Sequence, residues 1–181
     1  MVEFMVSITI MLILFAIALL NYNQSREEIA LQRAAYKLAQ DIRQVQEMAS
    51  GAETAPGCFN AGQPIYPAYK YKFGINLKSA DLNKYTLYSD CNGDNNYTGV
   101  DYVVPVELSD FNLVEISSDT FSAFGNLNIL FLPPDLSVII RKDADESSNS
   151  VSIVLQSKKD PNKKKSIYTN KAGLIDVQNV P

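Results

Sequence analysis

Residues 1–50, MVEFMVSITIMLILFAIALLNYNQSREEIALQRAAYKLAQDIRQVQEMAS, decide the fold of this chain, and no glycine or proline interrupts them. Within this stretch, residues 4–20 are apolar except for one serine and one threonine. These 17 residues would rise about 26 Å as an α-helix, close to the ~30 Å hydrocarbon core of a bilayer. A secretory signal would need basic residues before the run and an A-x-A site after it, so we expect a retained membrane segment.

The second part of the stretch carries a single apolar stripe. Its members are spaced alternately four and three residues apart, which places them on one face of an α-helix: Leu31, Ala35, Leu38, Ile42, Val45 and Ala49. The other faces carry charges, with Lys37–Asp41 and Arg43–Glu47 at the i,i+4 spacing of helix ion pairs. We therefore expect one helix over about residues 1–50, with its second part packed on a core.

Beyond this helix the apolar pattern changes to period two, which is typical of strands. Short strand-like runs separated by Asn, Asp, Gly and Pro turns occur at 69–77, 84–89, 102–108, 111–117, 128–132, 136–141, 151–156 and 165–170. Strands at hairpin spacing predict an antiparallel sheet, and Pro105 makes its run an edge strand or a bulge. The predicted fold class is α+β, with a membrane helix segment at 1–22, an amphipathic helix segment at 23–52 that packs on the head, and a β-sheet head at 53–181.

The composition excludes several kinds of chemistry. The 181 residues include no histidine, which removes the commonest general base and the Ser-His and Cys-His pairs. No nucleophile–base pair can be assembled from the carboxylates scattered over turns, so we do not expect an enzyme. The net charge of −4 does not by itself point to nucleic acid.

A polar loop, DCNGDNNYTGVD at 90–101, is the most chemically distinctive part of the head. Its oxygen-bearing side chains occupy positions 1, 3, 5, 7 and 12 of a twelve-residue loop: Asp90, Asn92, Asp94, Asn96 and Asp101. Calcium prefers such ligands, and an Asp at position twelve resembles dockerin-type loops more than EF-hands. An ordinary Asn/Asp/Gly turn between two strands explains the same residues, so calcium binding and a plain turn remain alternatives.

The chain has two cysteines, Cys58 just beyond the helix and Cys91 inside the polar loop. In a domain outside the cytosol they predict one disulfide, the alternative being two unrelated thiols. A redox role is not indicated, because no C-x-x-C motif is present.

Five lysines surround the DPN turn at 160–162: Lys158, Lys159, Lys163, Lys164 and Lys165. Such a cluster could contact DNA phosphates. Lysine-rich hairpin tips are common, however, and no aromatic residues are interleaved for base stacking. The sequence therefore does not favour DNA as a partner.

The whole chain resembles type IV pilins and type II secretion pseudopilins, most specifically over residues 1–50. MVEFMVSITIMLILFAIALL follows the family's N-terminal methylation segment, although its Gly-Phe-Thr and its helix-breaking proline are missing here. RAAYKLAQDIRQVQEMASGA, YKYKFGINL, KYTLYSD and NKAGLIDV are similar to H-type minor pseudopilins. The resemblance implies that Glu3 corresponds to the family's N-terminal acid, which in assembled pilins faces the methylated N-terminal amine of a neighbouring subunit.

The function that this resemblance implies is structural. The chain would wait in the cytoplasmic membrane, be extracted by pilus or secretion machinery, and join copies of itself or related pilins in an extracellular filament. An isolated carboxylate in an apolar fibre core is costly, and pairing with an amine offsets that cost. The alternative is a membrane-anchored extracytoplasmic domain that binds calcium or DNA and never polymerises.

Overall fold

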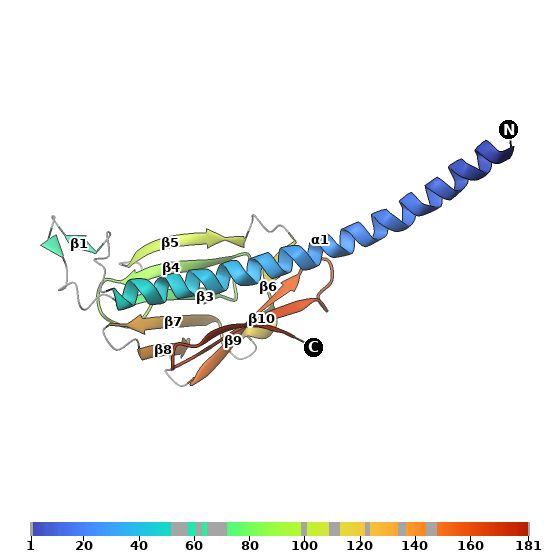
Figure 1. Cartoon of the computed structure of the whole chain (residues 1–181). Helices are drawn as coiled ribbons and strands as arrows, with labels where there is room; N and C mark the ends of the chain where they lie inside the picture. Colours follow the sequence, from blue (N-terminus) through green and yellow to red (C-terminus); the bar gives the residue numbers. More distant parts are fainter. Residues whose placement is uncertain are drawn as a thin grey trace.

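The computed structural model describes residues 2–51, 58–60, 63–64, 72–98, 101–108, 113–121, 124–133, 137–143 and 148–180. The side chains of residues 18–24, 59–60 and 63–64 lie outside this description. The fold is α+β, as expected, with strands lying along the C-terminal part of a helix (Figure 1). The elements are helix α1 (Val2–Ser50), strands β1 (Phe59–Asn60), β2 (Gln63–Pro64), β3 (Lys72–Lys78), β4 (Lys84–Asp90), β5 (Tyr102–Glu107) and β6 (Val114–Ile116), the short helix η3 (Ser118–Phe121), and strands β7 (Asn126–Leu132), β8 (Ser137–Lys142), β9 (Ser150–Ser157), β10 (Lys164–Asn170) and β11 (Ile175–Asn179).

The strands of the described chain form two larger antiparallel sheets and one small ribbon. The five-stranded sheet has the order β5-β4-β3-β7-β8, the four-stranded sheet has the order β11-β10-β9-β6, and β1 pairs with β2. The predicted antiparallel pairing is confirmed, but the strands divide between two larger sheets where one was expected. Hairpin spacing indicates which neighbours pair, but β6 joins β9 from far along the chain, and the local pattern carries no sign of that pairing.

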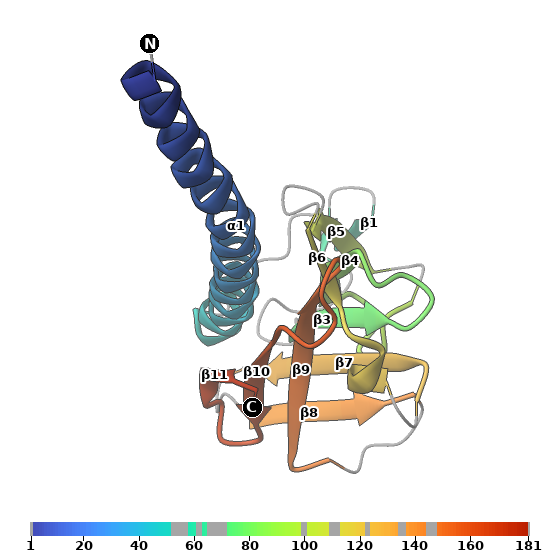
Figure 2. The same ribbon diagram turned by 90° about the vertical axis from the view of Figure 1, so that its right-hand side faces the viewer.

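The apolar stripe of helix α1 forms the centre of the core. All six residues that the spacing placed on it are buried, and Ala34 and Ala39 join them. The helix contacts β3 and β7 of the five-stranded sheet and β9, β10 and β11 of the four-stranded sheet. Figure 2 shows it on one side of the strands, so one helix face closes the core of both sheets. Burial of each Leu or Ile there contributes about 1.5–3 kcal/mol.

Alternation along β3 separates the two faces of the five-stranded sheet. Phe73, Ile75 and Leu77 belong to the helix-side core, as predicted. Asn76 lies between two of them in sequence and therefore points to the opposite face. It is nevertheless buried, so the outer face of this sheet is partly covered as well.

The sequence predicted several strand features correctly and missed others. Pro105 lies in β5, which is an edge of the five-stranded sheet, as expected. Strand β11 was not anticipated, because it is short, follows the AGL turn signal and has only two apolar side chains, Ile175 and Val177. Tyr69 and Tyr71, which we expected on the same strand face as Phe73, lie outside the described residues.

Candidate functional site

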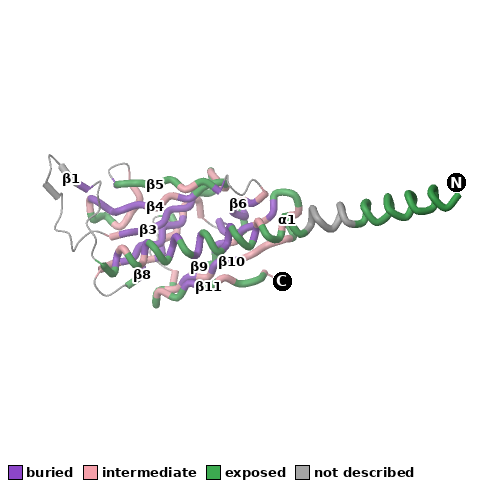
Figure 3. Tube along the Cα trace, turned by 45° about the horizontal axis from the view of Figure 1, so that its top comes forward, coloured by how far each residue is buried: buried purple, intermediate pink, exposed green. Residues whose placement is uncertain are grey.

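The first part of helix α1, residues 2–17, lies outside the packed head. Its large apolar side chains are exposed on all faces, from 46 % at Ile8 to 75 % at Val2. Figure 3 shows this exposed segment extending away from the strands. Contiguous apolar surface of this extent marks contact with lipid or with another protein.

Glu3 lies in the first turn of this segment and is exposed. The Ser7 hydroxyl donates to the Glu3 backbone carbonyl oxygen at 2.9 Å, so this hydrogen bond does not involve the Glu3 carboxylate. None of the ion pairs among the described residues involves the Glu3 carboxylate, and Met1 is not among those residues. Pairing of Glu3 with the amine of a neighbouring copy stays a prediction.

The membrane segment expected at 4–20 extends into the part of α1 whose side chains are not described. Over the described residues, no helix meets the combined length and hydropathy expected of a membrane span.

The second part of helix α1 contains a polar cluster in which the predicted Lys37–Asp41 pair is present, but its burial and its contact with Tyr85 were not expected. Asp41 was expected on an outward face, but it is only 3 % exposed. It pairs with Lys37 at 2.5 Å and accepts a hydrogen bond from the Tyr85 hydroxyl of β4. Burial, and then the Asp41 carboxylate, raise the pKa of the Tyr85 phenol. The cluster positions the helix on β4 through a specific polar contact.

The second ion pair expected on helix α1, Arg43–Glu47, is absent from the ion pairs of the described residues. The Arg43 guanidinium donates instead to the Ile175 backbone carbonyl oxygen of β11 at 3.1 Å. Arg43 was paired wrongly because strand β11, which supplies the Ile175 carbonyl, was not predicted. Residue spacing within a helix gives no information about a carbonyl so far away in the sequence.

Most of the lysine cluster is engaged within the molecule. Two ammonium groups approach Glu27 of helix α1, Lys159 at 3.8 Å and Lys163 at 3.7 Å. Lys164 pairs with Asp119, and Lys165 donates to the Asn179 side-chain oxygen at 2.6 Å. The exposed Lys158 donates its backbone N–H to the Leu113 carbonyl oxygen at 2.9 Å. These contacts tie the β9–β10 hairpin to its surroundings, and DNA binding stays a prediction that charge alone does not favour.

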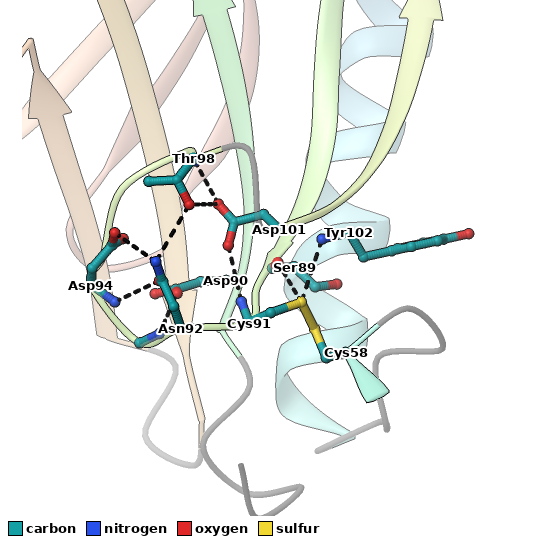
Figure 4. Close-up of a disulfide and its surroundings, with 10 residues drawn as sticks. Cys58, Ser89, Asp90, Cys91, Asn92, Asp94, Thr98, Asp101 and Tyr102 are labelled. Atoms are coloured by element: carbon teal, nitrogen blue, oxygen red, sulfur yellow. Dashed lines mark hydrogen bonds between the residues drawn. A yellow bond between two sulfur atoms is a disulfide. The ribbon is translucent and has the colours of Figure 1, made fainter. Parts of the chain in front are cut away.

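The polar loop is organised by its two terminal carboxylates (Figure 4). Asp90 accepts the backbone N–H of Gly93 at 2.6 Å and of Asn95 at 2.9 Å. Asp101 accepts the N–H of Cys91 at 3.1 Å and of Thr98 at 2.6 Å. Gly93 and Asn95 have φ values of 78° and 62°, a region open to glycine and tolerated by asparagine.

The middle of the loop is satisfied in the same way. The Asn92 amide donates to the Asp94 carboxylate at 2.8 Å, and the other Asp94 oxygen accepts the Asn96 N–H at 2.7 Å. Burial raises the pKa of Asp101, and its hydrogen bonds from Thr98 and Cys91 oppose this shift.

This arrangement suits a self-capped turn better than a calcium cage. A bound calcium needs six to eight oxygens that converge on it, whereas these carboxylates are directed at N–H donors. The described residues contain no group of three or more acidic or cysteine ligands placed to hold a metal. Calcium binding therefore stays a prediction, which thermal melting with and without chelator tests.

The expected disulfide joins Cys58 to Cys91, with their Cα atoms 5.2 Å apart. Both residues are buried, so the bond is enclosed by the head. It links the segment that follows helix α1 to the start of the polar loop, across 33 positions of sequence. A loop of that length corresponds to about 3–4 kcal/mol in the chain-entropy estimate.

Comparisons of the chain with protein-family models, with curated proteins and with solved structures found no match.

Proposed function

We propose that this chain is a structural subunit, a pilin or pseudopilin, of a type IV pilus-like extracellular filament. The exposed apolar side chains of residues 2–17 support this proposal most strongly, because the head uses none of them for its own core. A surface of this kind needs lipid before assembly and neighbouring helices after it. The proposal includes the pilin fold, in which one continuous helix of about 50 residues joins the fibre core to the head.

In this proposal the first part of helix α1 resides in the cytoplasmic membrane until the assembly machinery extracts it. Side chains such as Leu12, Phe15 and Ile13 then pack between copies of the chain or related pilins. Glu3 pairs with the N-terminal amine of the adjoining copy, because an unpaired carboxylate in an apolar core costs several kcal/mol. That cost favours one axial register between subunits.

A Glu3→Ala variant tests this function in the source cell. We expect the variant to insert into the membrane normally and to be lost from sheared surface filaments. Glu28→Ala is the matched control, since Glu28 is an exposed acid on the same helix, outside the apolar segment. Filament yield is measured by shearing and immunoblotting, and insertion by membrane fractionation.

The second candidate is an extracytoplasmic binding domain with a permanent membrane anchor. The same exposed apolar segment favours it, because lipid alone could cover these side chains. The two candidates predict the wild-type chain in different cell fractions. A permanent anchor leaves it in the membrane and absent from filaments, and Glu3→Ala then has no effect on either fraction. If the wild-type chain is found in filaments and Glu3→Ala does not lower its amount there, the filament proposal stands but the pairing role of Glu3 is wrong.

A further inference from the structure

Two asparagines occupy the middle of the outer face of the five-stranded sheet. Asn76 of β3 and Asn128 of β7 are paired in register and point away from helix α1. They are 3 % and 5 % exposed. The Asn76 amide nitrogen donates to the Asn128 side-chain oxygen at 2.7 Å. Buried amides on a sheet face opposite the core need a cover, and the structure supplies one.

The cover is the end of the polar loop. Lys72 binds the Asn95 side-chain oxygen, and Arg141 donates to the Asn95 backbone carbonyl oxygen at 3.2 Å. Tyr97 packs edge-to-face on Tyr88, with ring centroids 5.3 Å apart. Tyr88 has room because its neighbour in β3 is Gly74, where an added Cβ would lie 2.9 Å from the Tyr88 ring. Residues 95–97 are thereby held over the outer face of the sheet.

A cavity of about 410 Å³ that is open to solvent is lined by residues of this cover and of the sheet. Its walls are mainly amides and one phenol ring: Asn76, Asn96, Tyr97, Asn126 and Asn128. The two charged residues that line it, Lys78 and Asp143, have opposite signs. Asp143 is fixed by the N–H groups of Gly125 at 2.9 Å and Asn126 at 2.8 Å, and the Lys78 ammonium lies over the Tyr97 ring, 4.8 Å from its centroid.

The paired asparagines have hydrogen-bonding capacity left over. Within the described chain, the Asn76 side-chain oxygen and the Asn128 amide nitrogen have no hydrogen-bond partner. Neither atom is completely shielded from solvent, so a ligand in the cavity can reach both. The pair therefore leaves one acceptor and one donor unused among the residues that line the cavity. Adjacent hydroxyls of one ligand match this pair, because each hydroxyl can both donate and accept.

We propose that this cavity binds a neutral saccharide unit. Lys78 and Asp143 together give the walls no net charge, so the amides and the phenol ring, which suit neutral hydroxyl groups, dominate the lining. A peptide adding as a strand would use a free sheet edge, β5 or β8, whereas the cavity lies over the inner strands β3 and β7. The volume falls within the range of small-molecule sites. This inference stands apart from the filament proposal, because it concerns the head alone.

Ligand-observed saturation-transfer NMR on the full chain in a zwitterionic detergent tests the site. Alkyl glycoside detergents are avoided because they would compete. The probes are glucose, galactose, mannose, N-acetylglucosamine and lactose, with glucuronate, glucosamine and acetyl-trialanine-amide as contrasting ligands. We expect saturable binding of at least one neutral sugar with a Kd on the order of 1 mM, as ligand efficiency for polar molecules of this size implies.

Two variants test whether the asparagines carry this binding. Asn128→Asp keeps the oxygen that accepts from Asn76 and replaces the outward donor with an acceptor, so we expect binding to weaken about 10-fold or more. Asn96→Ala removes a rim amide without altering either sheet, and we expect a loss of about 3- to 10-fold. Asn162→Ala, at the exposed tip of the β9–β10 hairpin, should bind as the wild type does.

Three results would overturn the proposal: no neutral sugar binds the wild type, the contrasting ligands bind equally well, or Asn96→Ala and folded Asn128→Asp bind like wild type. If thermal melting shows that Asn128→Asp is unfolded, Asn96→Ala decides alone. None of these outcomes depends on whether the chain forms filaments.

Discussion

The two parts of helix α1 are both helical but have opposite relations to the rest of the molecule. Residues 2–17 expose apolar side chains on every face, whereas residues 31–49 bury one stripe and expose charged groups elsewhere. The two parts differ both in how many apolar residues they contain and in how these residues are spaced. A stripe suits one folded partner, the head, and an all-round apolar surface suits several surrounding partners.

The second part is also fixed at both of its ends. Near its start, Glu27 faces two lysines of the β9–β10 hairpin. Beyond its end, the Cys58–Cys91 disulfide ties the following segment to the head. The first part has no equivalent contacts among the described residues. We therefore expect substitutions in the two parts to act on different properties, stability in one and association in the other.

The largest expected effect contrasts the same substitution in both parts. Leu38 is fully buried between the helix and the sheets, so Leu38→Ala should lower the free energy of unfolding of the head by about 4 kcal/mol. Leu12 is exposed, so Leu12→Ala should change it by less than about 0.5 kcal/mol. Urea unfolding of the detergent-solubilised chain, followed by near-ultraviolet circular dichroism of the tyrosines, measures both.

The same pair of variants has the opposite ranking for association. If residues 2–17 form the fibre core, Leu12→Ala should reduce filament yield although the head is unaffected. Equal losses of head stability in the two variants would contradict the division of helix α1 into two functional parts.

A smaller effect concerns the buried polar contact of the second part. Tyr85→Phe removes the hydroxyl that donates to Asp41 and leaves this buried carboxylate with Lys37, so unfolding should become easier by about 2 kcal/mol. Tyr36→Phe is the control, because Tyr36 is exposed on the outward face of the same helix. Thermal and urea unfolding at pH 7 compare the two variants, and a loss as large in Tyr36→Phe would remove the special role of Asp41.

The pH dependence of the same contact follows from the raised pKa of Tyr85. A phenol whose pKa is higher in the folded state stabilises the fold fully below its unfolded value, about 10, and this stabilisation declines as the pH rises further. Tyr85→Phe should therefore lose less stability than the wild type between pH 10 and pH 11. Urea unfolding at these two pH values measures the difference, and equal losses would contradict it.

These contacts show what could be predicted from the sequence and why the rest could not. Regular spacing revealed the stripe from Leu31 to Ala49, the strand faces around Ile75 and the edge position of Pro105, because each depends on local periodicity. Tyr85, which binds Asp41, is 44 residues away in sequence, and the carbonyl that binds Arg43 is 132 residues away. Contacts at such separations depend on how the sheets divide, which no local pattern records.

The same distinction between local patterns and distant contacts applies to the candidate sites. The oxygen spacing of the polar loop suggested a metal, but the direction of each carboxylate is set by backbone N–H groups that the spacing does not reveal. Asn76 and Asn128 were overlooked because each is an isolated polar residue within a strand. Only their pairing across β3 and β7, under Tyr97, makes them a site.

The smallest expected effect locates the boundary between the two parts of helix α1. Glu27 lies 3.7–3.8 Å from the Lys163 and Lys159 ammonium groups, of which the latter is largely exposed. Partly exposed pairs of this kind contribute about 0.5 kcal/mol and weaken with salt. Glu27→Gln should therefore leave global stability nearly unchanged while it speeds amide hydrogen exchange in the first turn of the buried part, around residues 27–31.

The neighbouring Glu28→Gln is the matched control, since Glu28 is exposed, and 0.5 M NaCl should reproduce the Glu27→Gln effect in the wild type. Faster exchange confined to residues 27–31 would place the boundary at the hairpin contact. Unchanged exchange would show that the packing of Leu31 alone holds the start of the buried part. The Glu27 ion pairs would then carry no measurable energy, and the packing of helix α1 against β9 and β10 would account for the position of the hairpin.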